Sequence, residues 1–260
     1  MKTNIFRIVA LVISLSLVFT LVGFSASGAE CHSWYIKRNG NKRPGFPEDA
    51  GEVAEHGGYF IDERVGEDSE RRVIYLTFDV GYENGNVEKI LDTLKSEQIP
   101  AAFFLLDNII LKNTDLVKRM SKEGHLACNH TKNHKDLSNA DEETIAKDLS
   151  ALEAIYEEKI GCEMSKYFRF PEGKYSISAL STVEKLGYKT IFWSFGYDDW
   201  DNGRQPSPTA AIKKILSNTH NGAIILLHPT SSTNAEILPT LIKAWRGMGY
   251  TFGTLDELTS

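Results

Sequence analysis

From Arg71 to the C-terminus, short apolar segments alternate regularly with longer amphipathic ones. Apolar runs with few polar interruptions predict strands that are buried on both faces, and the amphipathic segments predict helices that cover them. About seven such repeats favour a parallel (β/α) barrel over a six-stranded open sheet. The predicted strands are Val73–Phe78, Ala101–Leu106, His125–Cys128, Tyr167–Phe170, Tyr188–Trp193, Ala223–Leu227 and Tyr250–Phe252. The predicted helices are Val87–Glu97, Leu116–Glu123, Glu142–Glu158, Ile177–Leu186, Thr209–Ser217 and Ala235–Gly247.

Residues 1–29 have the pattern of a signal peptide. Lys2 and Arg7 carry positive charge, the run Ile8–Phe24 is apolar, and small residues follow it. Ser27 and Ala29 match a small-x-small cleavage pattern, which predicts cleavage after Ala29. An uncleaved membrane anchor is the alternative, because the apolar run is nearly long enough to span a bilayer. In either case the folded domain is expected outside the cytoplasm, with no stable membrane insertion of the mature domain.

Residues 30–70 show no regular period, whereas residues 71–260 carry the repeats. We interpret the first of these segments as an ordered but irregular N-terminal arm with one short helix near Glu48–Glu55. The chain has a formal net charge of −6, which argues against nucleic acid as a partner bound mainly by charge. Its three cysteines, Cys31, Cys128 and Cys162, form no disulfide framework that the spacing reveals. We expect a monomer.

Two polar clusters follow directly after predicted strands in the first half of the repeats. Asp79 ends a very apolar strand, where a carboxylate at a barrel mouth can act as a base or a ligand, although a turn or capping aspartate is a common alternative. His130 and His134 follow another strand, and a spacing of four predicts two imidazoles on one face of a helical turn. This spacing can place both on one metal ion. Taken alone it is a weak signal.

Three further clusters follow later strands. Arg169 leaves a strand just before the turn made by Pro171 and Gly173, and its planar fork can orient a carboxylate. Asp199 and Trp200 follow the next strand, and His228 is the first polar residue after a buried one. Each residue also has an ordinary structural explanation, such as a surface arginine or a core tryptophan. Their joint occurrence at successive strand ends favours a functional site.

The five clusters resemble the ordered motifs of the polysaccharide deacetylases, the NodB-homology carbohydrate esterases. The matching stretches are Thr77-Phe78-Asp79-x-Gly81, His130-Thr131-x-x-His134, Arg169-x-Pro171-x-Gly173, Asp199-Trp200 and Leu226-x-His228. The resemblance covers about residues 71–255, and five motifs in the right order are a specific signal. It implies a distorted (β/α) barrel that hydrolyses N-acetyl groups on sugars, which assigns residues 71–260 to a polysaccharide deacetylase domain.

A narrower resemblance concerns the run from Tyr75 to Gly85 and parts of the arm, namely Trp34, Lys37-Arg38 and Pro47–Ala50. These stretches are similar to the delta-lactam-biosynthetic de-N-acetylases of the spore cortex. That subgroup implies N-acetylmuramic acid of peptidoglycan glycan strands as the substrate, in a step toward muramic delta-lactam during sporulation.

The family resemblance also implies roles for individual residues. Asp79 would be the general base, oriented and kept ionised by Arg169, and His228 would be the general acid, oriented by Asp199. Trp200 and Leu226 would form the pocket for the acetyl methyl group. Tyr82 and Pro171 would contribute to substrate binding, and His130 and His134 would be ligands of a divalent metal such as zinc.

Val80 departs from the family pattern, because most members carry a second aspartate there as a metal ligand. Valine has no donor atom, so metal affinity should fall. Three interpretations remain open: weak metal binding shared with substrate, a ligand role for Asp79, or histidines that act by hydrogen bonding alone. The spore-cortex subgroup typically has asparagine at this position, so the loss of this ligand need not abolish activity.

Three other functions remain as alternatives. A general peptidoglycan or chitin-oligomer deacetylase would keep the chemistry and change the substrate. A glycan-binding module with reduced catalysis is favoured by Val80 but opposed by the retained Asp79, Arg169 and His228. A zinc peptidase is disfavoured, because Thr131 replaces the glutamate of a His-Glu-x-x-His motif.

Overall fold

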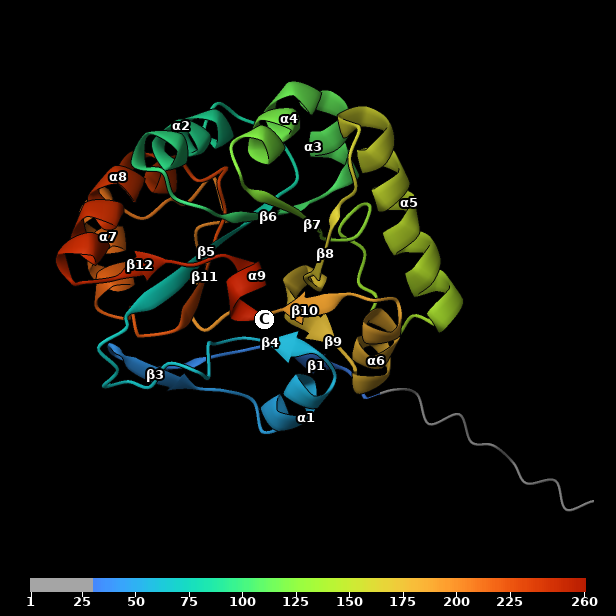
Figure 1. The fold of residues 1–260 in the computed structure, drawn as a ribbon, viewed down its shortest axis with the longest axis horizontal. Coiled ribbons are helices and arrows are strands. Elements are labelled where there is room, and N and C mark those ends of the chain that lie inside the picture. The colour runs from blue at the N-terminus through green and yellow to red at the C-terminus, as the bar shows by residue number, and fades with distance from the viewer. Residues whose placement is uncertain (1–29) are drawn as a thin grey trace, which may run out of the picture.

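The computed structural model describes residues 30–260, so the signal peptide predicted for residues 1–29 lies outside the described residues. Its main feature is a curled parallel sheet with the strand order β11-β5-β6-β7-β8-β10-β4, and β12 pairs with the first residues of β5 (Figure 1). The strands are β4 (Gly58–Tyr59), β5 (Val73–Val80), β6 (Ala102–Leu105), β7 (Leu126–Asn129), β8 (Ser165–Phe168), β10 (Lys189–Ile191), β11 (Ala223–Leu227) and β12 (Thr251–Phe252).

The sheet closes irregularly between β10 and β11. Just after β10, the Ser194 amide donates to the Ile224 carbonyl, and the Leu226 amide donates to the Phe195 carbonyl. At the other end of the gap, β4 runs parallel to β10, and Ile61 forms an antiparallel bridge to Ala223. The predicted distorted (β/α) barrel is therefore confirmed.

Except for the short α9 near the middle of the view, the helices of the barrel cover the outside of the sheet, as Figure 1 shows. The longest is α5, which begins where the Asp141 side chain accepts a hydrogen bond from the Thr144 amide and ends at Gly161 with a positive φ of 86°. The α2 helix has the predicted bounds, whereas α3 was not predicted. The helices of the barrel are α2 (Val87–Glu97), α3 (Asp107–Lys112), α4 (Thr114–Lys122), α5 (Glu142–Ile160), α6 (Ile177–Lys185), α7 (Pro208–Leu216), α8 (Ser232–Gly247) and α9 (Leu255–Leu258).

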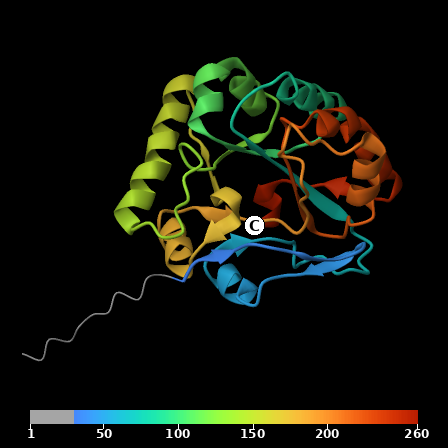
Figure 2. The same cartoon turned by 180° about the vertical axis from the view of Figure 1, so that it is seen from behind.

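Residues 30–70 pack along one side of the barrel (Figure 2). Their first strand, β1 (His32–Ser33), is antiparallel to β9 (Lys174–Tyr175), and β4 belongs to the main sheet. Trp34 is buried, with its ring stacked on Phe192 at 4.6 Å between centroids. The segment thus contributes to the core and to the sheet. Its other elements are β2 (Lys37–Asn39), β3 (Lys42–Gly45) and α1 (Ala50–Glu55).

The alternation of side chains along β5 places the candidate base at the barrel mouth. Val73 and Tyr75 belong to an apolar cluster with Phe104 and Ile224, whereas Ile74 belongs to the cluster that includes buried residues of α2 and α8. Because side chains alternate between the two faces of a strand, Asp79 lies on the same face as Tyr75, at the carboxyl end. Within residues 30–260, the helices are too short or too polar to cross a bilayer.

Candidate active site

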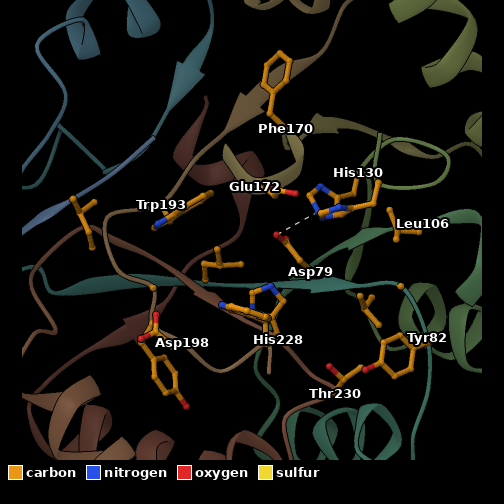
Figure 3. A pocket seen from close by; sticks show the side chains of 18 of the residues that line it. Asp79, Tyr82, Leu106, His130, Phe170, Glu172, Trp193, Asp198, His228 and Thr230 are labelled. Carbon is orange, nitrogen blue, oxygen red and sulfur yellow. Dashed lines mark ion pairs between the residues drawn. The ribbon is translucent and has the colours of Figure 1, made fainter. Parts of the chain in front are cut away.

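A cavity of about 850 Å³ opens at the carboxyl ends of the parallel strands. Its lining includes residues at or just after the ends of six strands, β5, β6, β7, β8, β10 and β11, and residues from the N-terminal segment. Figure 3 shows Asp79 between His130 and His228. Ligands of parallel α/β barrels bind at this end of the sheet. Of the residues predicted from sequence, seven line the cavity: Asp79, Tyr82, His130, His134, Trp200, Leu226 and His228.

Arg169 fixes the Asp79 carboxylate. Its guanidinium is fully buried and donates to Asp79 Oδ1 at 2.7 Å and to the Thr77 hydroxyl at 2.9 Å. Its Nε donates to the Ile191 carbonyl at 2.8 Å, so the fork has one orientation. Burial alone would raise the pKa of Asp79, but the positive charge of Arg169 outweighs it, and the pKa is lowered. Asp79 is therefore an oriented carboxylate that is ionised at neutral pH.

The two histidines lie on a loop. The prediction of a helical turn is wrong, because no helix includes residues 130–138 and both Thr131 and His134 have positive φ, of 66° and 62°. The loop nevertheless brings the two rings together, with centroids 5.0 Å apart. His130 is buried, whereas His134 is exposed to solvent.

The tautomer of His130 follows from its hydrogen bond. Nδ1 lies 2.8 Å from the Arg169 carbonyl oxygen, which can only accept, so Nδ1 carries the proton. Burial lowers the pKa of His130 to about 4, and the neutral ring directs its free Nε2 at Asp79 Oδ2, 3.6 Å away. Two acceptors facing each other can share a water molecule or a cation between them.

These residues do not form a complete metal site. Among residues 30–260, no group of three or more His, Cys, Asp or Glu side chains is placed to hold a metal ion. The cavity offers the imidazoles of His130 and His134 beside Asp79. The adjoining Val80 also lines the cavity, but its apolar side chain has no donor atom. This donor set falls short of a closed protein site.

On the opposite side of Asp79, His228 is held by buried polar groups. Asp199 is fully buried and accepts from His228 Nδ1 at 2.7 Å and from the His228 backbone amide at 2.8 Å. Burial would lower the pKa of His228, but the charge and hydrogen bond of Asp199 raise it above its ordinary value. With Nδ1 engaged, Nε2 is the ring atom left to face the cavity.

Asn234 completes this support, and sequence reasoning missed it. Its amide nitrogen donates to Asp199 Oδ2 at 2.6 Å and to the His228 carbonyl at 3.1 Å, and its oxygen accepts from the Tyr197 hydroxyl. Asn234 lies in the first turn of α8, far along the chain from Asp199. No local pattern marks it, because its role depends on the loop after β11 folding back onto that helix.

The residues predicted to bind substrate divide into two groups. Trp200 and Tyr82 are exposed at the cavity, with 60% and 44% of their surface accessible, and Leu226 lies in its wall. Pro171 is buried, and among the described residues it is the neighbours Phe170 and Glu172 that line the cavity instead.

The turn after Pro171 requires glycine. Gly173 has a positive φ of 66°, and an added Cβ would lie 2.8 Å from the Trp193 ring. The turn at Gly173 therefore packs closely against the Trp193 ring, and Trp193 also lines the cavity. The lining residues that were not predicted as site residues include Arg38, Glu172, Trp193 and Asp198. The last of these adjoins Asp199 in the sequence, so the motif itself could have indicated it.

Comparison with known proteins identifies the family of this chain. The family model for polysaccharide deacetylases matches residues 66–191. The peptidoglycan-N-acetylmuramic acid deacetylase PdaA of Bacillus subtilis is 34% identical, over 87% of this chain and 85% of that protein. A peptidoglycan-N-acetylglucosamine deacetylase of Bacillus cereus is 32% identical, over 72% of this chain and 88% of that protein. The structure of Bacillus subtilis PdaA, a family 4 carbohydrate esterase, superposes with a TM-score of 0.82 at 32% identity, covering 88% of this chain and 97% of that one. The chain belongs to the polysaccharide deacetylase family.

Proposed function

We propose that this protein is an exported amide hydrolase that removes the N-acetyl group of N-acetylmuramic acid in peptidoglycan, in the step before muramic delta-lactam formation in a spore cortex. One observation carries the chemistry: a carboxylate held by Arg169 and an imidazole held by Asp199 flank one cavity. The choice of sugar is supported by the similarity to PdaA, which is named for N-acetylmuramic acid.

The reaction follows from the two oriented groups. Asp79 accepts a proton from a water molecule, whose oxygen attacks the acetamide carbonyl carbon and forms a tetrahedral oxyanion. His228, whose pKa the charge and hydrogen bond of Asp199 raise above its ordinary value, donates a proton to the amine nitrogen. The C–N bond then breaks, and acetate and the free amine of the sugar leave. His130 supplies a neutral Nε2 that can accept a hydrogen bond from the attacking water.

The exposed aromatic residues suit a glycan chain. Trp200 and Tyr82 present flat apolar surfaces at the cavity, and sugar rings carry C–H faces that pack on such surfaces. We infer that they support the sugar, while Leu226 contacts the acetyl methyl group. The mature protein is proposed to act as a monomer on the outer side of the cytoplasmic membrane, where peptidoglycan lies.

Two alternatives have specific support. The similarity to the Bacillus cereus enzyme, which is named for N-acetylglucosamine, favours a general peptidoglycan or chitin-oligomer deacetylase. The absence of a donor at Val80 favours a glycan-binding module with reduced catalysis. The second alternative has no explanation for the paired orientation of Asp79 and His228, which binding does not need.

Acetate release tests the proposal. The mature protein would be incubated with peptide-free muramic acid strands and with chitin oligomers, and acetate would be measured for the wild type and for Asp79→Asn. We expect acetate from the muramic strands, and a fall of about 10²–10⁴-fold in Asp79→Asn. Asp198→Asn is the matched control, since Asp198 is also a cavity carboxylate, and it should retain activity. Acetate release from chitin oligomers alone would make N-acetylglucosamine oligomers the substrate. Binding of either glycan with no acetate release would favour the glycan-binding module.

A further inference from the structure

The lining of the cavity has an uneven distribution of charge. It contains three carboxylates, Asp79, Glu172 and Asp198, and a single arginine, Arg38, with no lysine. Two of the carboxylates already have cationic partners, since Asp79 pairs with Arg169 and Glu172 pairs with Lys174 at 2.7 Å. Arg38 is thus the one permanent cation that the described residues place in the cavity wall.

Arg38 is held in place without being neutralised. It lies on β2 and is exposed, and its guanidinium donates to the Gly196 carbonyl at 2.6 Å. Across residues 30–260, no carboxylate lies within ion-pair distance of it. The remaining N–H groups of the fork are therefore available to a ligand.

Gly196 places this guanidinium beside the wall where a sugar would sit. A Cβ added to Gly196 would lie 3.3 Å from the Trp193 indole and 3.7 Å from Leu226 Cβ, and both side chains line the cavity. The carbonyl that Arg38 contacts thus belongs to the same wall. The strand that carries Arg38 comes from the N-terminal segment, so this segment adds a cation to a site otherwise made by the barrel.

We propose that Arg38 recognises the lactyl carboxylate by which N-acetylmuramic acid differs from N-acetylglucosamine, and so sets the preference between the two sugars; this inference rests on the proposed function. An arginine fork matches a carboxylate in a bidentate geometry that no other side chain provides. N-acetylglucosamine has a hydroxyl in place of the lactyl ether and gains nothing from this charge.

The test compares three variants on three substrates. Arg38→Gln removes the charge, Arg38→Lys keeps it without the fork, and Lys37→Gln is the matched control. Lys37 is the adjacent exposed cation and faces the Tyr35 ring at 5.6 Å, outside the cavity lining. The substrates are peptide-free muramic strands, the same strands with the lactyl carboxyl reduced to an alcohol, and chitin oligomers.

For Arg38→Gln we expect the KM for carboxylate-bearing strands to rise about 10-fold, as for loss of one charged hydrogen-bonded contact. Its kcat, and its kinetics on reduced strands, should stay as in the wild type. The KM of Arg38→Lys for carboxylate-bearing strands should lie between the values for the wild type and for Arg38→Gln. The KM of Lys37→Gln should match that of the wild type. Equal losses on native and reduced strands, or no loss on either, would overturn the inference.

Calorimetric binding to native and reduced strands separates this inference from the proposed function. A wild type that releases no acetate yet prefers native strands, with the preference lost in Arg38→Gln, would overturn the function and support the role of Arg38. If the wild type releases acetate from muramic strands but Arg38→Gln binds them as tightly as the wild type, the proposed function would stand and the role of Arg38 would be overturned.

Discussion

Asp199 contacts His228 through both carboxylate oxygens, one on the imidazole Nδ1 at 2.7 Å and one on the backbone amide at 2.8 Å. Asp199 follows β10 and His228 follows β11, so the pair joins two neighbouring barrel loops. A fully buried carboxylate bound at two points fixes both the position and the tautomer of the ring. It also favours the charged imidazolium, as a general acid requires.

This pair predicts the alkaline limb of the pH profile. The pKa of His228 is raised above 6.5, so the acid stays protonated up to that higher value, and kcat should fall as the pH rises through it. Asp199→Asn removes the negative charge and leaves burial, which lowers the pKa. The limb should therefore move to lower pH, and the rate at neutral pH should drop about 10²-fold or more. The check is kcat measured from pH 5 to 9; an unshifted limb would assign the acid to another group.

Asn234 should act through the same pair. Asn234→Ala removes the donors to Asp199 and to the His228 carbonyl, so the ring loses part of its support, and we expect kcat to fall about 10-fold with little change in KM. Asn234→Asp would place a second carboxylate against Asp199, so its kcat should fall further than that of Asn234→Ala. Thr233→Ala is the control, because that hydroxyl donates to the Pro206 carbonyl on the other side of the turn. A uniform loss in all three variants would indicate a structural effect alone.

Arg169 should matter for stability as well as orientation. Its guanidinium contacts Asp79, Thr77 and two backbone carbonyls, which a single ammonium group cannot reproduce. Arg169→Lys should lower the free energy of unfolding by about 2–4 kcal/mol in urea titrations.

Arg246→Lys provides the matched control for that measurement. Arg246 also pairs with a carboxylate, Glu97, but at the surface. There the change should stay below about 1 kcal/mol. Equal effects at the two arginines would show that burial of the Arg169 fork adds nothing.

The barrel could be predicted because strand and helix periods are local. The bounds of α2 and β11 agree with the prediction, since α2 is one amphipathic run of helical period and β11 is one uninterrupted apolar run. The α3 helix was missed because it is six residues long and separated from α4 by Asn113 alone. The helical turn at His130 and His134 was wrong because a spacing of four also fits a loop with two positive φ values.

The site could be predicted only where its residues follow strand ends. Asp79, Arg169 and His228 meet because parallel strands end at one edge, a rule that the sequence pattern already contains. Arg38 and Asn234 reach the site through hairpin and helix packing between segments distant in the chain. No spacing rule encodes such contacts, so these residues require the structure.

The donor set of the site predicts weak binding of a divalent metal. Two imidazoles with Val80 in place of a third donor should bind zinc weakly, so dialysis against a chelator should remove it and activity should depend only weakly on added metal. Val80→Asp restores a carboxylate beside Asp79 and should raise zinc affinity at least about 10-fold, as measured by calorimetry. Val80→Asn, with an amide of the same size, is the control for packing and should gain less. Stoichiometric zinc that survives dialysis in the wild type would contradict the prediction, because it would require a ligand set that the described residues do not form.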